Sequence, residues 1–169
     1  TTTGFATVDY LGWPVFAPLF MLLLSGVATS AGSTGCGIKM VRMLILLKQA
    51  RREMTRLVHP NAVQPVRLGH TVVDHRVIFS VLAFMLVYGS TVIGLSMVLL
   101  LTDLDPVTAF SAVLASVNCT GPGLGLVGPV SNYAVLTDFQ LWVCTLAMLL
   151  GRLEMLSFMA LLTPAFWRR

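Results

Sequence analysis

The chain has 169 residues, of which 56% are hydrophobic and only 11% are charged, and its formal net charge is +4. Soluble domains carry about 25% charged residues, so this composition excludes an ordinary soluble domain and predicts an integral membrane protein in a lipid bilayer. The positive charge does not indicate nucleic-acid binding, because the basic residues lie where membrane topology would place them.

The chain starts with a Thr-Gly motif, Thr2-Thr3-Gly4-Phe5, ahead of a long apolar segment. It has no initiator Met, and no basic, apolar and small-residue sequence that would form a signal peptide. We therefore interpret residues 1–12 as the end of a loop in a longer protein whose preceding segments are missing.

The next segment, 11–38, contains no charged residue over 28 positions, which exceeds the about 20 residues that a transmembrane helix needs. Four glycines interrupt its second half, together with serines and threonines: Gly26, Gly32, Gly35 and Gly37. The pattern predicts a broken helix over 13–55 with an intramembrane loop at 26–37. Irregular backbone at this depth is tolerated only where protein or a water-filled cavity shields it from lipid.

Charge then alternates along the chain. Residues 39–76 carry eight of the eleven basic residues, which predicts a cytoplasmic segment with a connection at 56–76. Residues 77–102 are uncharged and predict a plain span, whereas 102–138 contain no Lys or Arg and predict an outer loop. A last span is expected at 138–167, ending in Trp167-Arg168-Arg169 at the inner face.

A short apolar run lies between these last two spans. It starts at Pro106 behind a possible capping residue, Asp105, and ends at Asn118. A run of this length is too short to cross a bilayer and is typical of a re-entrant segment. We expect residues 106–125 to form a pore helix followed by a filter loop, Cys119-Thr120-Gly121-Pro122, with the negative end of the helix dipole toward a cation.

The Thr-Gly motif thus occurs twice, each time before an apolar segment that glycine interrupts. The interval is 31 residues from Gly4 to Gly35 and 30 from Gly121 to Gly151. Glycine allows successive carbonyls to point the same way, and a ring of carbonyls can replace the hydration shell of a potassium ion. We interpret both loops as filter segments that bind K⁺ through backbone carbonyls of Thr3, Gly4, Thr120 and Gly121; ordinary extracellular turns are the alternative.

Two charges lie in the middle of the last span. Arg152 and Glu154 are flanked by 13 uncharged residues on each side, and charges at this depth are costly and often functional. Because they are two residues apart on a helix, they cannot face each other well. We expect Arg152 near the 32–37 loop and Glu154 against a neighbouring helix; an ion pair buried for packing is the alternative.

The sequence gives little support for nucleotide binding, cysteine chemistry or catalysis. The segment 31–39 is similar to a phosphate-binding loop, but Ile38 separates Gly37 from Lys39 and a membrane helix precedes it. The cysteines Cys36, Cys119 and Cys144 are widely spaced, so we expect them to be unpaired small apolar residues. No set of polar residues resembles a catalytic site, such as paired carboxylates or Ser and His at membrane depth. We therefore do not expect an enzyme, and we expect no organic cofactor.

Several motifs together resemble the Trk/Ktr/HKT superfamily of potassium transporters, in particular the TrkH/TrkG membrane subunits of bacteria. The similar segments cover nearly the whole chain in order: 31–42, 56–62, 118–125, 151–154 and 162–168. The resemblance implies an all-α integral membrane fold, K⁺-channel-like, in which helix–pore loop–helix units repeat four times around one pore. This chain would run from the third filter segment through the fourth repeat.

The resemblance also implies roles and partners. Filter positions would be Thr2, Thr3, Gly4 and Phe5 in the third repeat and Cys119, Thr120, Gly121 and Pro122 in the fourth. Gly32, Gly35 and Gly37 would belong to an intramembrane gate that Arg152 faces. The whole protein would be a homodimer in the bacterial inner membrane, crossing it several times, with a cytosolic nucleotide-binding regulatory ring, and K⁺ would be the transported ion.

Two positions depart from the family pattern. Cys36 stands where the family usually has Gly, and a side chain there would stiffen the gate. Cys119-Thr120 follows Asn118 at a position where relatives vary. The preference for K⁺ over Na⁺, and coupling to H⁺ or Na⁺, stay open. A non-conducting membrane scaffold that recruits a cytosolic partner through the basic segment is the alternative function.

Overall fold

The computed structural model describes residues 2–27, 29–33, 35–60, 64–153, 155 and 167, and this part of the chain is mostly helical. Its longer elements are α1 (Phe16–Val27), α2 (Met40–Val58), β1 (Arg67–Leu68), β2 (Thr71–Val72), α3 (His75–Leu100), α4 (Pro106–Val117) and α5 (Asp138–Arg152). Three short 3₁₀ turns complete the set: η1 (Tyr10–Gly12), η2 (Gly125–Val127) and η3 (Tyr133–Val135).

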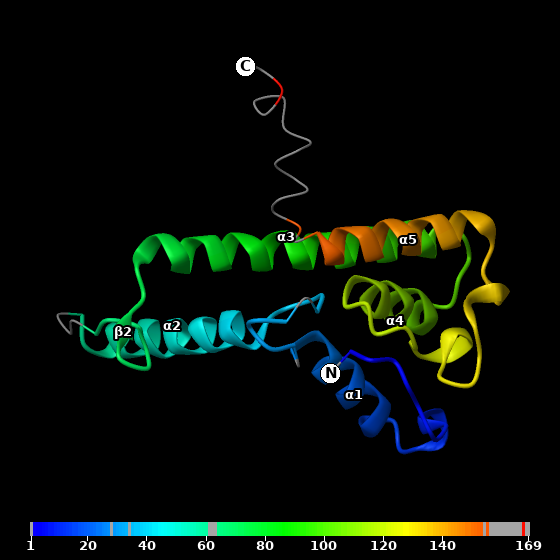
Figure 1. The fold of residues 1–169 in the computed structure, drawn as a ribbon, viewed down its shortest axis with the longest axis horizontal. Coiled ribbons are helices and arrows are strands. Elements are labelled where there is room, and N and C mark those ends of the chain that lie inside the picture. Colours follow the sequence, from blue (N-terminus) through cyan, green and yellow to red (C-terminus); the bar gives the residue numbers. More distant parts are fainter. Residues whose placement is uncertain are drawn as a thin grey trace.

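The helices surround the short helix α4. Figure 1 shows the long helix α3 and helix α5 along one side of the molecule, with α4 beneath them in the view and α1 beyond it. Helix α4 contacts α3, α5 and α1, while α2 packs along the other half of α3. Segments far apart in the sequence therefore meet at the end of α4.

Within the described residues, one helix is long and apolar enough to cross a membrane. It is α3, with 26 residues and a mean hydropathy of 2.1, close to the span expected at 77–102. Helices α1 and α4 are shorter and apolar. Of the last expected span, α5 covers the part up to Arg152, and most of its continuation toward 167 lies outside the described residues.

Small side chains allow α4 to sit among three helices. Ala109, Ala112 and Ala115 are completely buried, the first two of them in the main hydrophobic core. Gly151 of α5 faces the end of α4 so closely that a Cβ there would overlap the carbonyl oxygen of Val117. At its other end the helix begins as the sequence predicts, because the Asp105 carboxylate accepts a hydrogen bond from the Thr108 amide at 3.2 Å.

The expected broken helix has its break between Val27 and Met40. Two backbone hydrogen bonds connect the two sides of this break. The Ile38 amide donates to the Gly26 carbonyl at 3.0 Å, and the Met40 amide donates to the Thr29 carbonyl at 2.9 Å. The Thr29 hydroxyl adds a bond to the Ile38 carbonyl at 3.3 Å. We call this junction of 26–29 with 38–40 the neck, and residues 30–37 the neck loop. Gly26, which we expected in the loop, lies in α1 instead.

The expectation of an all-α fold missed a small β-hairpin in the basic segment. Strands β1 and β2 pair in antiparallel fashion, Arg67 opposite Val72, around a turn at Gly69 with φ of 61°. Lys48 of α2 donates to the Arg67 carbonyl at 2.6 Å. Val66, next to the hairpin, is buried with Ile45 and Ile78, so the hairpin closes the gap between α2 and α3. The strands are too short for their sequence pattern to be visible.

Candidate functional site

The two Thr-Gly loops lie against each other, although 117 positions separate their glycines (121 minus 4). A Cβ added to Gly4 would lie 2.5 Å from the carbonyl oxygen of Thr120. The first loop, Thr2 to Phe5, lines a cavity of about 360 Å³ together with Thr120 and Pro122. All four residues 119–122 line a second cavity of about 550 Å³ with Thr3 and Gly4.

The backbones of the two loops repeat each other. Thr2 has a φ of 54° and Gly4 of 81°, while Cys119 has 52° and Gly121 has 94°. Left-handed backbone is uncommon for Thr and Cys, so its presence at matching positions indicates a shared local structure. In each loop a left-handed residue precedes Thr-Gly, with a left-handed glycine at the end. This torsion pattern is what the doubled sequence motif encodes.

The second loop continues directly from α4. The Cys119 amide donates to the Ser116 carbonyl at 3.0 Å, and the Thr120 amide donates to the Ala115 carbonyl at 2.9 Å. These bonds fix the loop to the C-terminal turn of the helix, where the helix dipole places partial negative charge. The environment therefore favours a cation at the loop.

Two tyrosines outside the sequence motifs donate hydrogen bonds to carbonyls of this loop and the residues just after it. The Tyr133 hydroxyl donates to the Gly121 carbonyl at 2.8 Å, and the Tyr10 hydroxyl donates to the Gly123 carbonyl at 3.3 Å. Burial raises the pKa of Tyr133 to about 12, with a smaller contribution from Cys144. The Gly121 oxygen, one of those expected to bind K⁺, thus already accepts one hydrogen bond and keeps a second lone pair.

A separate cavity of about 320 Å³ brings the neck loop next to α5. Gly35, Gly37 and Arg152 all line it, whereas Gly32, the third glycine expected there, is not among its lining residues. Lys39 and Arg42 also line it, and the Arg42 guanidinium lies 4.1 Å from the centre of the Phe84 ring. We call it the basic cavity, because the described residues that line it include three basic side chains. Glu154, expected beside a neighbouring helix, lies outside the described residues.

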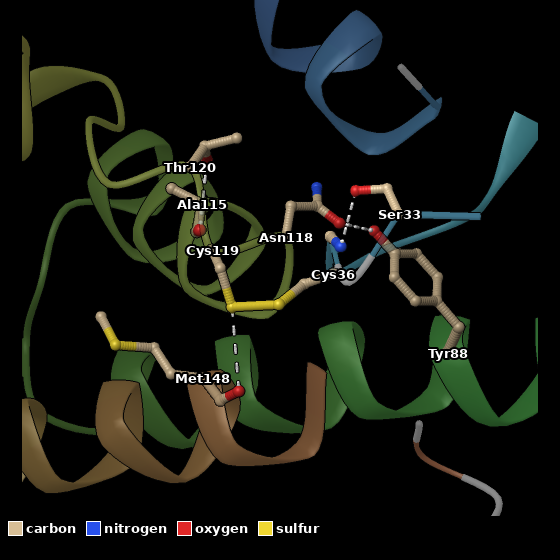
Figure 2. The surroundings of a disulfide bond; sticks show 9 residues. Ser33, Cys36, Tyr88, Ala115, Asn118, Cys119, Thr120 and Met148 are labelled. Carbon is tan, nitrogen blue, oxygen red and sulfur yellow. Dashed lines mark hydrogen bonds between the residues drawn. A yellow bond between two sulfur atoms is a disulfide. The ribbon is translucent and has the colours of Figure 1, made fainter. Parts of the chain in front are cut away.

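Asn118 joins the loops, and sequence analysis gave it no role beyond ending the short helix. Its side chain is fully buried and accepts a hydrogen bond from the Tyr88 hydroxyl at 2.9 Å (Figure 2). A Cβ at Gly37, where φ is 82°, would lie 2.5 Å from the Asn118 Oδ1 atom. Only glycine therefore fits at position 37. The Asn118 carboxamide sets how closely the neck loop approaches α4.

The expectation that all three cysteines are unpaired is wrong for two of them. Cys36 of the neck loop and Cys119 of the second Thr-Gly loop form a disulfide, with 5.8 Å between their Cα atoms (Figure 2). Sequence spacing gave no indication of this bond, because 83 residues separate the partners and only the fold brings them together. Cys144 is free and buried. Among the described residues, no cluster of His, Cys, Asp and Glu could hold a metal ion.

Apolar helices thus enclose two backbone loops, an arrangement typical of an integral membrane protein. The family model for TrkH, described as a cation transport protein, matches residues 1–168, so the chain belongs to the TrkH family. The family comprises transport proteins rather than enzymes, and the chain is part of a multi-pass protein of the bacterial inner membrane. The resemblance seen in the sequence is thereby confirmed.

Individual relatives agree along the whole chain. It is 40% identical over 168 residues to the Trk system potassium uptake protein TrkH of Salmonella typhimurium and 38% identical to TrkG of Escherichia coli K12. The crystal structure of the potassium transporter TrkH from Vibrio parahaemolyticus superposes with a TM-score of 0.91 at 40% identity. That match covers 99% of this chain and 36% of the other. The chain spans about a third (34%) of the length of these curated relatives.

Proposed function

We propose that this chain contributes two filter segments and an intramembrane gate to a pathway for potassium uptake across the bacterial inner membrane. The observation that carries the proposal is the matched backbone of the two Thr-Gly loops, which lie against each other at the end of α4. Support for potassium as the transported ion comes from the names of the relatives, which are Trk system potassium uptake proteins.

In this mechanism, a potassium ion sheds water and is held by backbone carbonyls of Thr3, Gly4, Thr120 and Gly121. Carbonyl dipoles can replace the hydration shell, and the C-terminal end of α4 adds partial negative charge. The hydrogen bonds from the Cys119 and Thr120 amides to the helix keep the second loop in position. The selectivity between K⁺ and Na⁺ depends on how rigidly these carbonyls are held.

Below the filter, the ion meets the basic cavity. Arg152 lines it together with Gly35 and Gly37, and a fixed positive charge beside an ion path raises the barrier for a cation. The neck loop and Arg152 would therefore restrict conduction until the loop moves. In the whole protein we propose a homodimer, with a cytosolic nucleotide-binding ring that regulates it from the inner face; the relatives' names, which refer to a Trk system, agree with a complex of several components.

The test is rubidium uptake into proteoliposomes by a full-length protein that contains residues 1–169. Gly121→Ser should abolish uptake, because φ of 94° strains any other residue by about 1–2 kcal/mol and the carbonyls would turn. No atom lies within 4 Å of a Cβ at Gly121, so the variant should still fold. Gly12→Ala is the control: it also has open space, without the left-handed backbone.

Arg152→Ala should increase uptake, because it removes a positive charge from the path. Uptake that is unchanged in Gly121→Ser would contradict the filter assignment. A wild-type protein that shows no cation flux with its regulator present would favour the alternative function, a non-conducting scaffold that recruits a partner through the basic segment.

A further inference from the structure

We propose that Cys36 and Cys119 form a reversible thiol–disulfide site that locks the neck loop to the Thr-Gly loop when oxidised and releases it when reduced. The inference rests on the proposed function, because the bond joins the segment assigned to the gate to the segment assigned to the filter. It adds a chemical signal, the redox state of two sulfurs, to the control of ion passage.

The positions of the two residues suit such a bond. Their Cα atoms are 5.8 Å apart, within the range of about 4.4–6.8 Å in which disulfides form without backbone movement. Cys119 is anchored by its amide to the Ser116 carbonyl, at the end of a fully buried helix segment. Its partner therefore bonds to a loop that is itself fixed by hydrogen bonds to the C-terminal turn of α4.

Without the bond, the neck loop would be far less restrained. The hydrogen bonds of the neck connect 26–29 with 38–40, and the described part of the loop adds two bonds of its own, from the Ser33 amide to the Ser30 carbonyl at 3.2 Å and from the Gly35 amide to the Ser33 hydroxyl at 3.1 Å. These bonds lie within the loop or at its base, whereas the disulfide is a covalent bond from the loop to Cys119, the second residue after α4. Reduction would leave the neck intact and free the loop to leave the basic cavity.

The two sulfurs differ in access. Cys36 is only 3% exposed, whereas Cys119 lines the 550 Å³ cavity together with the outer-loop residues 127–129 and 131–133. A dithiol reductant would therefore attack the Cys119 sulfur. Its first thiolate forms a mixed disulfide with Cys119 and expels Cys36 as a thiolate, which takes up a proton.

The second thiolate of the dithiol then displaces Cys119, which also takes up a proton, and the reductant leaves as a cyclic disulfide. In sum, two electrons and two protons pass from the dithiol to the two protein sulfurs. The released Cys119 thiol has an acceptor nearby, since the Met148 carbonyl oxygen lies 3.9 Å from its sulfur (Figure 2). The reverse reaction, with a small disulfide as oxidant, returns both electrons to the oxidant and restores the bond.

The test compares rubidium uptake by the full-length protein in proteoliposomes before and after treatment with dithiothreitol. Alkylation followed by mass spectrometry of the same samples reports whether Cys36 and Cys119 are joined. We expect uptake to rise roughly tenfold on reduction, within the range typical of coupling between two sites. Cys36→Ala should show the high rate with or without reductant, while Cys144→Ala, which alters a cysteine outside the pair, should respond as the wild type does.

Equal uptake before and after a reduction that mass spectrometry verifies would overturn the lock while leaving the filter and gate assignments standing. Free Cys36 and Cys119 thiols after treatment with a disulfide oxidant would also overturn it. Absence of uptake in both redox states would instead refute the proposed function, and the lock with it. Because the main comparison uses the wild-type protein, it does not depend on any variant folding.

Discussion

At the scale of single residues, Tyr133 controls a carbonyl that the proposed mechanism needs. Its hydroxyl donates to the Gly121 oxygen at 2.8 Å. A hydrogen bond of this kind contributes about 1 kcal/mol net, which corresponds to about fivefold in an equilibrium constant. We therefore expect Tyr133→Phe to lower the preference for Rb⁺ over Na⁺ about fivefold, measured by competitive uptake, with little change in melting temperature.

Tyr10→Phe is the matched control, because it removes a hydroxyl from the same loop but at the Gly123 carbonyl, beyond the Thr-Gly pair. Burial raises the pKa of Tyr133 to about 12, so its proton, and hence the hydrogen bond, is retained while an unfolded tyrosine would ionise near pH 10. Selectivity should accordingly stay constant from neutral pH to about pH 10. A loss of selectivity in Tyr10→Phe equal to that in Tyr133→Phe would contradict a specific role for the Gly121 contact.

At the scale of elements, the crossing of α5 over the end of α4 depends on Gly151. A Cβ at this position would overlap the Val117 carbonyl oxygen, which belongs to backbone and cannot rotate away. Gly151→Ala should push the helices apart and destabilise the protein by about 1–3 kcal/mol, the usual cost of overpacking. Thermal unfolding in detergent, followed by circular dichroism, would measure this as a lower melting temperature.

Gly94→Ala provides the comparison on α3, because nothing lies within 4 Å of a Cβ at that helical glycine. There the gain in helix propensity should leave stability unchanged or raise it by up to about 1 kcal/mol. Equal melting temperatures for Gly151→Ala and Gly94→Ala would show that the close packing of α5 on α4 does not cause the loss of stability.

The helices of this fold follow from simple sequence patterns. Uncharged runs and glycines predicted α3 and the broken helix, and Asp105-Pro106 predicted the start of α4, because capping chemistry is local. Helix α1 begins at Phe16, three residues after the expected start of the broken helix at residue 13, because apolar composition does not show where a helix begins. The hairpin at 67–72 was missed because its two-residue strands carry no periodicity.

Much of the candidate site depends on contacts that sequence cannot reveal. The sequence placed Gly35, Gly37 and Arg152 in one region, and all three line the same cavity. It gave no reason to connect Cys36 with Cys119, or Tyr133 with Gly121, because such pairs are set by how the helices pack. Tyr133 lies between α4 and α5 in a segment without a motif, so no signal marked it.

At the scale of the whole molecule, the distribution of charge predicts which end of the bundle faces the cytoplasm. The basic segment 39–76 should lie inside, and the segment 102–138, which lacks Lys and Arg, should lie outside. A membrane-impermeant maleimide applied to intact spheroplasts should label Ser131→Cys and spare His70→Cys, both of which are exposed positions. After permeabilisation, both should be labelled.

The parent protein, whose Cys36 and Cys144 are buried, sets the background for this labelling. Labelling of His70→Cys in sealed spheroplasts, with Ser131→Cys spared, would invert the orientation and place the basic cavity on the outer side of the Thr-Gly loops.

In the proposed mechanism, the neck would set the speed of gating. Because α1 and α2 are joined by hydrogen bonds between Gly26 and Ile38 and between Thr29 and Met40, the neck loop can swing while the two half-helices stay together. Loop motions take about nanoseconds to microseconds, whereas collective movements of helices take about microseconds to milliseconds. A passage controlled by this loop alone can therefore flicker rapidly, and the bond between Cys36 and Cys119 would suppress that flicker and leave only the slower motion of the helices.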